Sequence, residues 1–152
     1  MPTTDHVKIL FEFHSDVLDA WTVETVWAEI INEDEGLYKI DNIPFYAPTS
    51  ADNIVYAEYD ESQERLTYRD TVEYSGNSTI QVVILIENVP TNEIRDFFNA
   101  FNCESEKFND GYFVMNVPAT ESYLPIREKL LELQSEGIID FAEPCLGNGH
   151  WY

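Results

Sequence analysis

Hydrophobic and polar residues alternate through the first half of the chain, and this alternation predicts β-strands. From Val7 to His14, apolar residues occupy every second position, as in a strand that buries one face. Turn-forming segments such as Glu33-Asp34-Glu35-Gly36 separate the stretches of this kind. The strands expected here cover residues 7–14, 25–31, 37–40, 54–59, 65–69 and 71–74, and the last two ranges form either one strand or two.

The second half has a different rhythm, because a long apolar run and helical spacings replace the alternation. Thr79 to Glu87 is almost continuously apolar, which is typical of a strand covered on both faces. Two similar segments, Val89–Glu93 and Val117–Glu121, are each expected to open an amphipathic helix. Between these helices, Asn109-Asp110-Gly111 predicts a hairpin turn, because glycine tolerates a positive φ. Ile138 to Ala142 predicts a last strand.

The element order of the second half is therefore β-α-β-β-α-β, the ferredoxin-like arrangement. Gly137 is placed to end the second helix. The expected fold class is α+β, with a strand-rich curled sheet or partial barrel at residues 1–78 packed on a ferredoxin-like half at residues 79–152. Ser75–Ser78 is the only candidate linker and is short, so the two halves are expected to share one core.

The net charge restricts the possible functions of the protein more than any sequence motif does. The 152 residues include 29 Asp and Glu but only 8 Lys and Arg, which gives a formal charge of −21. Direct binding to nucleic acid or to an anionic membrane is not expected, because both are polyanions. Three explanations of the charge stay open: solubility, adaptation to high salt, and an acidic face for a basic protein. The excess of Glu over Asp and the many Asn, Ile and Tyr residues fit high salt poorly.

Two acidic segments of the strand-rich half form the candidate surface for a basic partner. One is the strand pair on either side of the acidic turn Asp60–Glu64, and the other is the turn Glu33–Glu35. Runs of charge are more often solvated turns than sites, and that reading stands beside the functional one. The candidate partner-binding residues are Glu58, Asp60, Glu61, Glu64, Asp70, Glu73, Glu33, Asp34 and Glu35.

A second candidate site is a pocket between the two halves. Asp41-Asn42 precedes Ile43-Pro44, and because proline fixes φ, this segment predicts a corner between strands whose Asn can bond local backbone. Such a corner would direct the following aromatic residues into the core. The alternative is a rim of aromatic and amide groups around a binding cleft. The possible pocket residues are Trp27, Tyr38, Asn42, Phe45 and Tyr46.

The chain carries no recognisable catalytic machinery. The histidines His6, His14 and His150 occur in no HxH or HExxH spacing, and there is no EF-hand loop, so neither a metal nor a cofactor is expected. Cys103 and Cys145 are far apart and are expected to be reduced, inert thiols. No nucleophile elbow, P-loop or dinucleotide motif is present. An enzyme would need a cleft that holds His14 or His150 beside Cys103 or beside a carboxylate of raised pKa.

The C-terminal segment Gly147–Tyr152 has two interpretations. It is either a flexible tail or a docked tail whose Trp151 and Tyr152 cover an apolar patch or contact a partner.

Three short segments carry a resemblance to a known family. They are W-A-E at Trp27–Glu29, L-Y-K-I-D-N-I-P-F at Leu37–Phe45 and the strand start at Asp52–Ala57. In these segments the chain resembles a widespread bacterial family of uncharacterised domains. The resemblance implies a bacterial origin and supplies no established activity and no catalytic residues.

These observations favour a binding protein over an enzyme. The first hypothesis is an acidic, cytoplasmic inhibitor, in concrete terms a bacterial immunity protein that neutralises a basic toxin such as a nuclease. The alternative is a small-ligand-binding or regulatory module that uses the pocket between the halves. The cytoplasmic location is expected because the N-terminal sequence has no basic segment followed by an apolar one, and because no apolar run reaches the length of a membrane span.

Overall fold

The computed structural model describes residues 5–15 and 17–151, and both halves contain the elements that the sequence pattern indicates. The fold is α+β, as predicted, and is mostly sheet. Along the described chain the elements are β1 (His6–Ser15), β2 (Ala20–Asn32), β3 (Leu37–Ile40), β4 (Ile54–Asp60), β5 (Arg65–Glu73), β6 (Ser78–Ile84), α1 (Thr91–Asn99), β7 (Glu104–Asn109), β8 (Tyr112–Val117), α2 (Leu124–Ser135) and β9 (Ile139–Cys145).

Strands β1 to β5 form a small closed barrel in sequence order. The predicted curled sheet is confirmed, and it closes fully through a parallel contact between β1 and β5 at Leu10 and Thr67. Alternate residues of the strands fill the barrel, and Ile9, Val26 and Val55 are completely buried. The period-2 pattern therefore located the barrel core correctly, because each of these strands buries one face.

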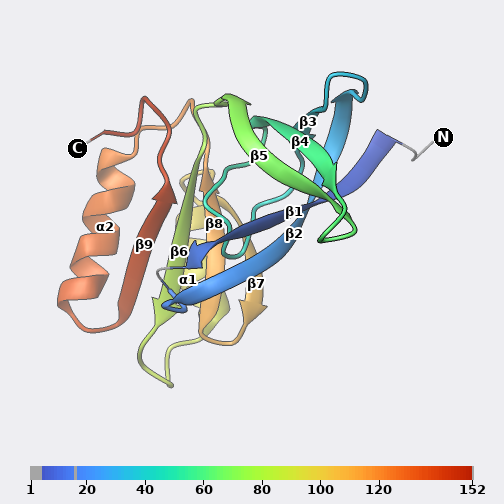
Figure 1. The fold of residues 1–152 in the computed structure, drawn as a ribbon. Helices are drawn as coiled ribbons and strands as arrows, with labels where there is room; N and C mark the ends of the chain where they lie inside the picture. The colour runs from blue at the N-terminus through green and yellow to red at the C-terminus, as the bar shows by residue number, and fades with distance from the viewer. Residues whose placement is uncertain (1–4, 16, 152) are drawn as a thin grey trace.

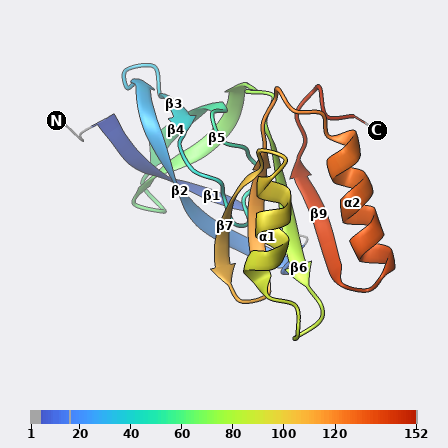
Figure 2. The ribbon, with the colours of Figure 1, turned by 180° about the vertical axis from the view of Figure 1, so that it is seen from behind.

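Strands β6 to β9 form a separate four-stranded sheet in the order β7-β8-β6-β9, with all neighbours antiparallel. Helix α1 lies behind this sheet in Figure 1 and in front of it in Figure 2, whereas the β1–β2 ribbon crosses the opposite face. Ile80 and Val82 pack under the helices, against residues such as Phe98 and Leu130. The predicted β-α-β-β-α-β order and the double coverage of β6 are both confirmed.

A third, smaller group of buried residues joins the barrel to the sheet. Ile43 and the partly buried Phe45 and Tyr46, from the segment between β3 and β4, pack on Tyr112 and Val114 of β8. The halves thus have their own buried clusters and meet through a contact that the Asp41–Phe45 corner supplies. As expected from Pro44, the corner lies outside any strand.

Several boundaries differ from the prediction. The second helix was expected to open at Val117–Glu121, and this is wrong, because Glu121 N–H bonds the Pro118 carbonyl in a turn and α2 starts only at Leu124. Strand β6 ends at Ile84, three residues before the end of the apolar run. Strand β2 starts at Ala20, five residues earlier than predicted. The two candidate strands at 65–69 and 71–74 are the single strand β5. Gly137 follows the end of α2 with φ +75°, as predicted.

Candidate functional site

An acidic turn and a strand that are far apart in sequence, Glu33–Gly36 and β4, line one groove on the barrel. The first acidic turn, Glu33–Gly36, connects β2 to β3, whereas the second, Asp60–Glu64 between β4 and β5, contributes no residue to the groove lining. The amide of Ala57 donates to the Gly36 carbonyl at 3.0 Å, which holds β4 beside the first turn. The resulting groove has a volume of about 330 Å³ and is lined by Glu33, Asp34, Glu35, Gly36, Tyr38, Tyr56, Ala57, Glu58, Tyr59 and Leu66.

Gly36 makes this close approach possible. Its φ is +72°, a conformation that residues with a side chain rarely adopt. A Cβ at this position would lie 2.8 Å from the Ala57 carbonyl oxygen and 2.8 Å from Cε1 of Tyr56. Because residue 36 is glycine, the backbone of the turn can approach Ala57 and Tyr56 closely at the floor of the groove.

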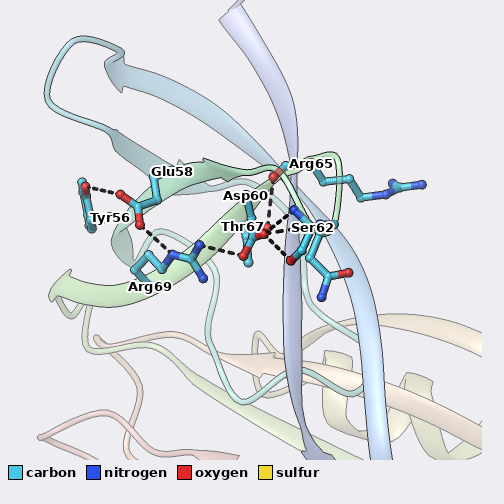
Figure 3. A network of polar contacts seen from close by, with 8 residues as sticks. Tyr56, Glu58, Asp60, Ser62, Arg65, Thr67 and Arg69 are labelled. Atoms are coloured by element: carbon cyan, nitrogen blue, oxygen red, sulfur yellow. Dashed lines mark hydrogen bonds and ion pairs between the residues drawn. The ribbon is translucent and has the colours of Figure 1, made fainter.

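An ion-pair network holds the wall formed by β4 and β5. The Arg69 guanidinium donates to Glu58 at 3.0 Å and to Asp60 at 2.8 Å. Figure 3 shows Arg69 between the two carboxylates, whereas the Arg65 side chain extends away from them. Because Asp60 also accepts hydrogen bonds from Ser62, and these are the larger effect, its pKa lies well below the usual carboxyl range. The predicted residues Glu58 and Asp60 thus already have an internal cationic partner.

Tyrosines give the groove its apolar and hydrogen-bonding surface. The Tyr56 hydroxyl donates to Glu58 at 3.0 Å, and this bond raises the pKa of Tyr56. Burial and the nearby Glu33 carboxylate raise the pKa of Tyr38, so both phenols stay neutral donors at physiological pH. The Tyr59 side chain is 63% exposed. Exposed tyrosine beside carboxylates is a composition typical of protein-binding surfaces.

The predicted partner-binding residues are only partly brought together. Glu33, Asp34, Glu35 and Glu58 line the groove. The other five lie outside the lining: Asp60 at the end of β4, Glu61 and Glu64 in the β4–β5 turn, and Asp70 and Glu73 farther along β5, opposite Tyr56 and Ile54 respectively. Sequence reasoning missed Gly36, Tyr56, Ala57, Tyr59 and Leu66, although a glycine at the end of an acidic turn is a sequence signal for a tight backbone approach.

A separate pocket of about 360 Å³ lies between the barrel and the sheet. Of the five predicted pocket residues, only Asn42 lines it. Tyr38 lines the acidic groove, Phe45 and Tyr46 belong to the third buried group, and Trp27 is on the outer barrel surface. The residues that do line the pocket are Asp41, Asn42, Ile43, Ala51, Asp52, Asn102, Glu104, Glu106, Asn116 and Pro118.

Carboxylates and amides from both halves dominate this pocket, and none of the described residues that line it is basic. Asn42 fixes the corner, because its Oδ1 accepts from the Trp27 amide at 2.8 Å and its Nδ2 donates to the Ile43 carbonyl at 3.1 Å. Among the described residues, Oδ1 of Asn116 is the buried side-chain polar atom that lacks a hydrogen-bond partner. The pocket can therefore accept hydrogen bonds from a cationic group.

Cys103 and His150 are both buried. Burial, followed by the nearby Glu121 carboxylate, raises the pKa of Cys103 to about 12, so this thiol is not an ionised nucleophile at neutral pH. His150 is buried with its Nδ1 on the Ser78 hydroxyl and its Nε2 2.9 Å from the Pro118 carbonyl oxygen. His150 therefore docks the C-terminal segment, whereas Trp151 is 71% exposed and Tyr152 lies outside the described residues.

Within residues 5–15 and 17–151, no group of three or more His, Cys, Asp or Glu side chains is arranged to hold a metal ion. In the same part of the chain, neither helix is long and apolar enough to cross a bilayer.

The fold defines an α+β protein in which a small barrel packs on a four-stranded sheet with two helices. The chain belongs to the family described as a domain of unknown function (DUF4265), whose model matches residues 24–141. This confirms the expected membership of an uncharacterised family with no established activity. The chain is also similar to a solved structure described as a "Novel crystal structure of a hypothetical protein from Neisseria gonorrhoeae". The TM-score is 0.77 with 22% identity, over 93% of this chain and 96% of that one, and this likeness shows the fold alone. A comparison with curated proteins found no match.

Proposed function

We propose that this protein binds a basic protein partner through the acidic groove between the Glu33–Gly36 turn and strands β4 and β5. The observation that carries the proposal is that carboxylates of the Glu33–Glu35 turn and of Glu58 in β4, which are distant in sequence, line one concave surface. A solubility coat needs charges on the surface, but it does not need carboxylates from two distant segments to line a common groove with tyrosines.

The net charge of −21 supports the same proposal through the rate of association. A strongly acidic protein attracts a basic one over distances comparable to the Debye length, which raises the association rate constant at low salt. The exposed Glu33 and Asp34 then meet the partner's Lys and Arg side chains, and Tyr59 supplies apolar contact area. Arg69 keeps Glu58 and Asp60 in fixed positions, so this wall is preorganised for binding.

In its specific form, the proposal is that the protein is a bacterial immunity protein that neutralises a basic toxin. A nuclease is the preferred class, because its own site presents Lys and Arg to phosphates and an acidic groove can cover that site. Inhibition then follows from steric and electrostatic blockage, without catalysis by this protein.

The test uses the purified basic proteins that are encoded by genes adjacent to the gene for this protein. Binding is measured by isothermal titration calorimetry, and any nuclease activity is assayed with and without one equivalent of this protein. The groove variant Glu33→Gln/Asp34→Asn/Glu35→Gln should weaken binding about 10-fold or more and should relieve inhibition. The control variant, called the α2 variant, carries the same change of three charges at exposed positions, Glu128 and Glu132 of α2 and Glu136 directly after it, each replaced by Gln. Equal affinity for both variants would refute the groove.

A second candidate function is supported by the pocket between the halves. With Asp41, Asp52, Glu104 and Glu106 on its walls, the pocket suits a small ligand that carries amino groups, such as a polyamine. Thermal denaturation with spermidine, and with NaCl at matched ionic strength as control, tests this proposal. A raised melting temperature in wild type that is lost in Glu104→Gln/Glu106→Gln would support it. A shift equal to that of NaCl would contradict it.

A further inference from the structure

The outward face of β2 carries a row of exposed apolar side chains that the acidic groove does not use. Trp21 is 77% exposed, Val23 56%, Trp27 49% and Ile31 45%. Odd-numbered residues of β2 share this face, because the even-numbered Val26 and Ala28 point into the barrel core. The residues Trp21, Val23, Trp27 and Ile31 are called the β2 stripe below.

We propose that the β2 stripe is the contact surface for a second copy of this chain. The two tryptophans and two aliphatic residues leave on the order of 500 Å² of apolar surface exposed, with Thr25 and Glu29 between them on the same face. A stable interface of standard size takes about 800 Å² from each partner. The exposed β1 side chains beside the stripe supply the remaining area.

Charge on the neighbouring strand favours a second copy over a cationic partner. The outward positions of β1 include Lys8, whose amine lies 5.0 Å from the Trp27 ring centre, whereas His6 and His14 already lie 2.6 and 3.7 Å from the carboxylates of Asp41 and Asp19. The His14 and Trp21 rings meet edge to face at 6.0 Å. Because the Lys8 cation already lies over Trp27, a cationic partner would be repelled at this position. A carboxylate of another copy would be attracted to the same charge.

The register of the β1–β2 ribbon makes this face self-complementary. Leu10 is paired with Thr25 at the middle of the ribbon. A two-fold axis through this pair and perpendicular to the strands places residues 8 and 12 of opposite copies together, and likewise residues 27 and 23. Lys8 of each copy then meets Glu12 of the other, while Trp27 packs on Val23. At these positions opposite charges and apolar groups are matched by the same operation, and farther from the axis Trp21 lies opposite Glu29 of the other copy.

The test is sedimentation velocity of the full chain between about 1 and 200 μM, in 50 mM and 500 mM NaCl. Wild type should form a dimer whose Kd falls as salt rises, because salt screens the repulsion between two acidic copies. Binding of a basic partner has the opposite salt dependence, so failure of either proposal can be told from failure of the other.

Trp21→Thr/Val23→Thr should raise the dimer Kd about 100-fold or more, since each substitution acts twice in a two-fold interface. Threonine keeps the strand propensity, and circular dichroism with urea unfolding verifies folding of each variant. The matched control is Trp151→Thr, which removes a tryptophan of similar exposure elsewhere and should leave Kd unchanged.

The register has its own test. Glu12→Lys should weaken the dimer, and Lys8→Glu/Glu12→Lys should restore it, because the swap re-forms the pair between copies. A monomer at every concentration and salt, or a dimer that persists in Trp21→Thr/Val23→Thr, would overturn the proposal. It would also be overturned if wild type and Trp21→Thr/Val23→Thr were both monomeric and the substitutions instead abolished binding of the basic partner.

Discussion

Replacing Glu24 by glutamine tests the contact that joins the two halves of the molecule. Glu24 extends from β2, and its carboxylate accepts three successive backbone N–H groups, those of Phe45, Tyr46 and Ala47, at 2.8, 2.9 and 2.8 Å. These three residues follow the corner at Asp41–Pro44, and Phe45 and Tyr46 pack on the sheet. The Tyr112 hydroxyl fastens the same segment by donating to the Phe45 carbonyl.

The expected loss follows from counting these bonds. One carboxylate oxygen of Glu24 accepts from Tyr46 and Ala47, and the other accepts from Phe45. Glutamine keeps one oxygen, but its NH₂ group cannot accept from the third N–H, and the remaining bonds lose their charge. Since a hydrogen bond to a charged group contributes about 1.5–3 kcal/mol, the free energy of unfolding should fall by about 2–4 kcal/mol. For a chain of this size the melting temperature should drop by about 6–12 °C.

Equilibrium urea unfolding, followed by tryptophan fluorescence, measures this loss. Glu87→Gln makes the same chemical change at an exposed loop position and should stay within about 0.5 kcal/mol of wild type. Hydrogen exchange adds a local readout, because the amides of residues 45–47 should exchange faster in Glu24→Gln. If Glu24→Gln is no less stable than Glu87→Gln, the carboxylate does not hold the two halves together.

Three further predictions concern the groove and the thiols. Gly36→Ala should lower the free energy of unfolding by about 2 kcal/mol in urea titrations, because φ is +72° and the added Cβ meets the Ala57 carbonyl; a loss below 0.5 kcal/mol would contradict this. Asp60→Asn should destabilise the protein at pH 7. Because the folded-state pKa of Asp60 is depressed, its contribution is full above the ordinary carboxyl pKa and is lost as pH falls toward the folded value. The difference in urea midpoint should therefore shrink below about pH 4, and a constant difference down to pH 3 would count against the network. In thiol titration with Ellman's reagent, Cys145 should react in the native protein and Cys103 only after denaturation, since burial raises the pKa of Cys103 to about 12; equal rates would refute this.

The sequence predicted the core better than it predicted the surfaces. Buried positions such as Ile9 and Val26 repeat with the period of their strand, so hydrophobicity alone locates them. The start of β2 was missed because Trp21 and Val23 are apolar but face outward, whereas the buried Val26 and Ala28 are at even positions. The apolar positions therefore do not keep one alternation along the whole strand. The late start of α2 has a different cause, since Asn77 binds the Ala119 amide at 2.8 Å and holds the chain in a turn.

Only part of the acidic groove could be predicted from the sequence. The acidic turn Glu33–Glu35 and Glu58 are each visible in the sequence, but their meeting depends on the pairing of β3 with β4, which no local pattern encodes. Asp70 and Glu73 looked equivalent to Glu58 in sequence, yet they lie on β5 outside the groove lining. Arg69 was likewise missed as the partner of Glu58 and Asp60, because cross-strand ion pairs follow from register.

The most direct measurement of the central claim is the association rate constant between this protein and the proposed basic partner in stopped-flow experiments at 50 and 300 mM NaCl. The account predicts that the rate falls steeply with salt for wild type. It further predicts a lower rate with a shallower salt dependence for Glu33→Gln/Asp34→Asn/Glu35→Gln, and a smaller change for the α2 variant. Equal rates and equal salt slopes for the groove variant and the α2 variant would contradict the account, because the charge would then act only as a general coat.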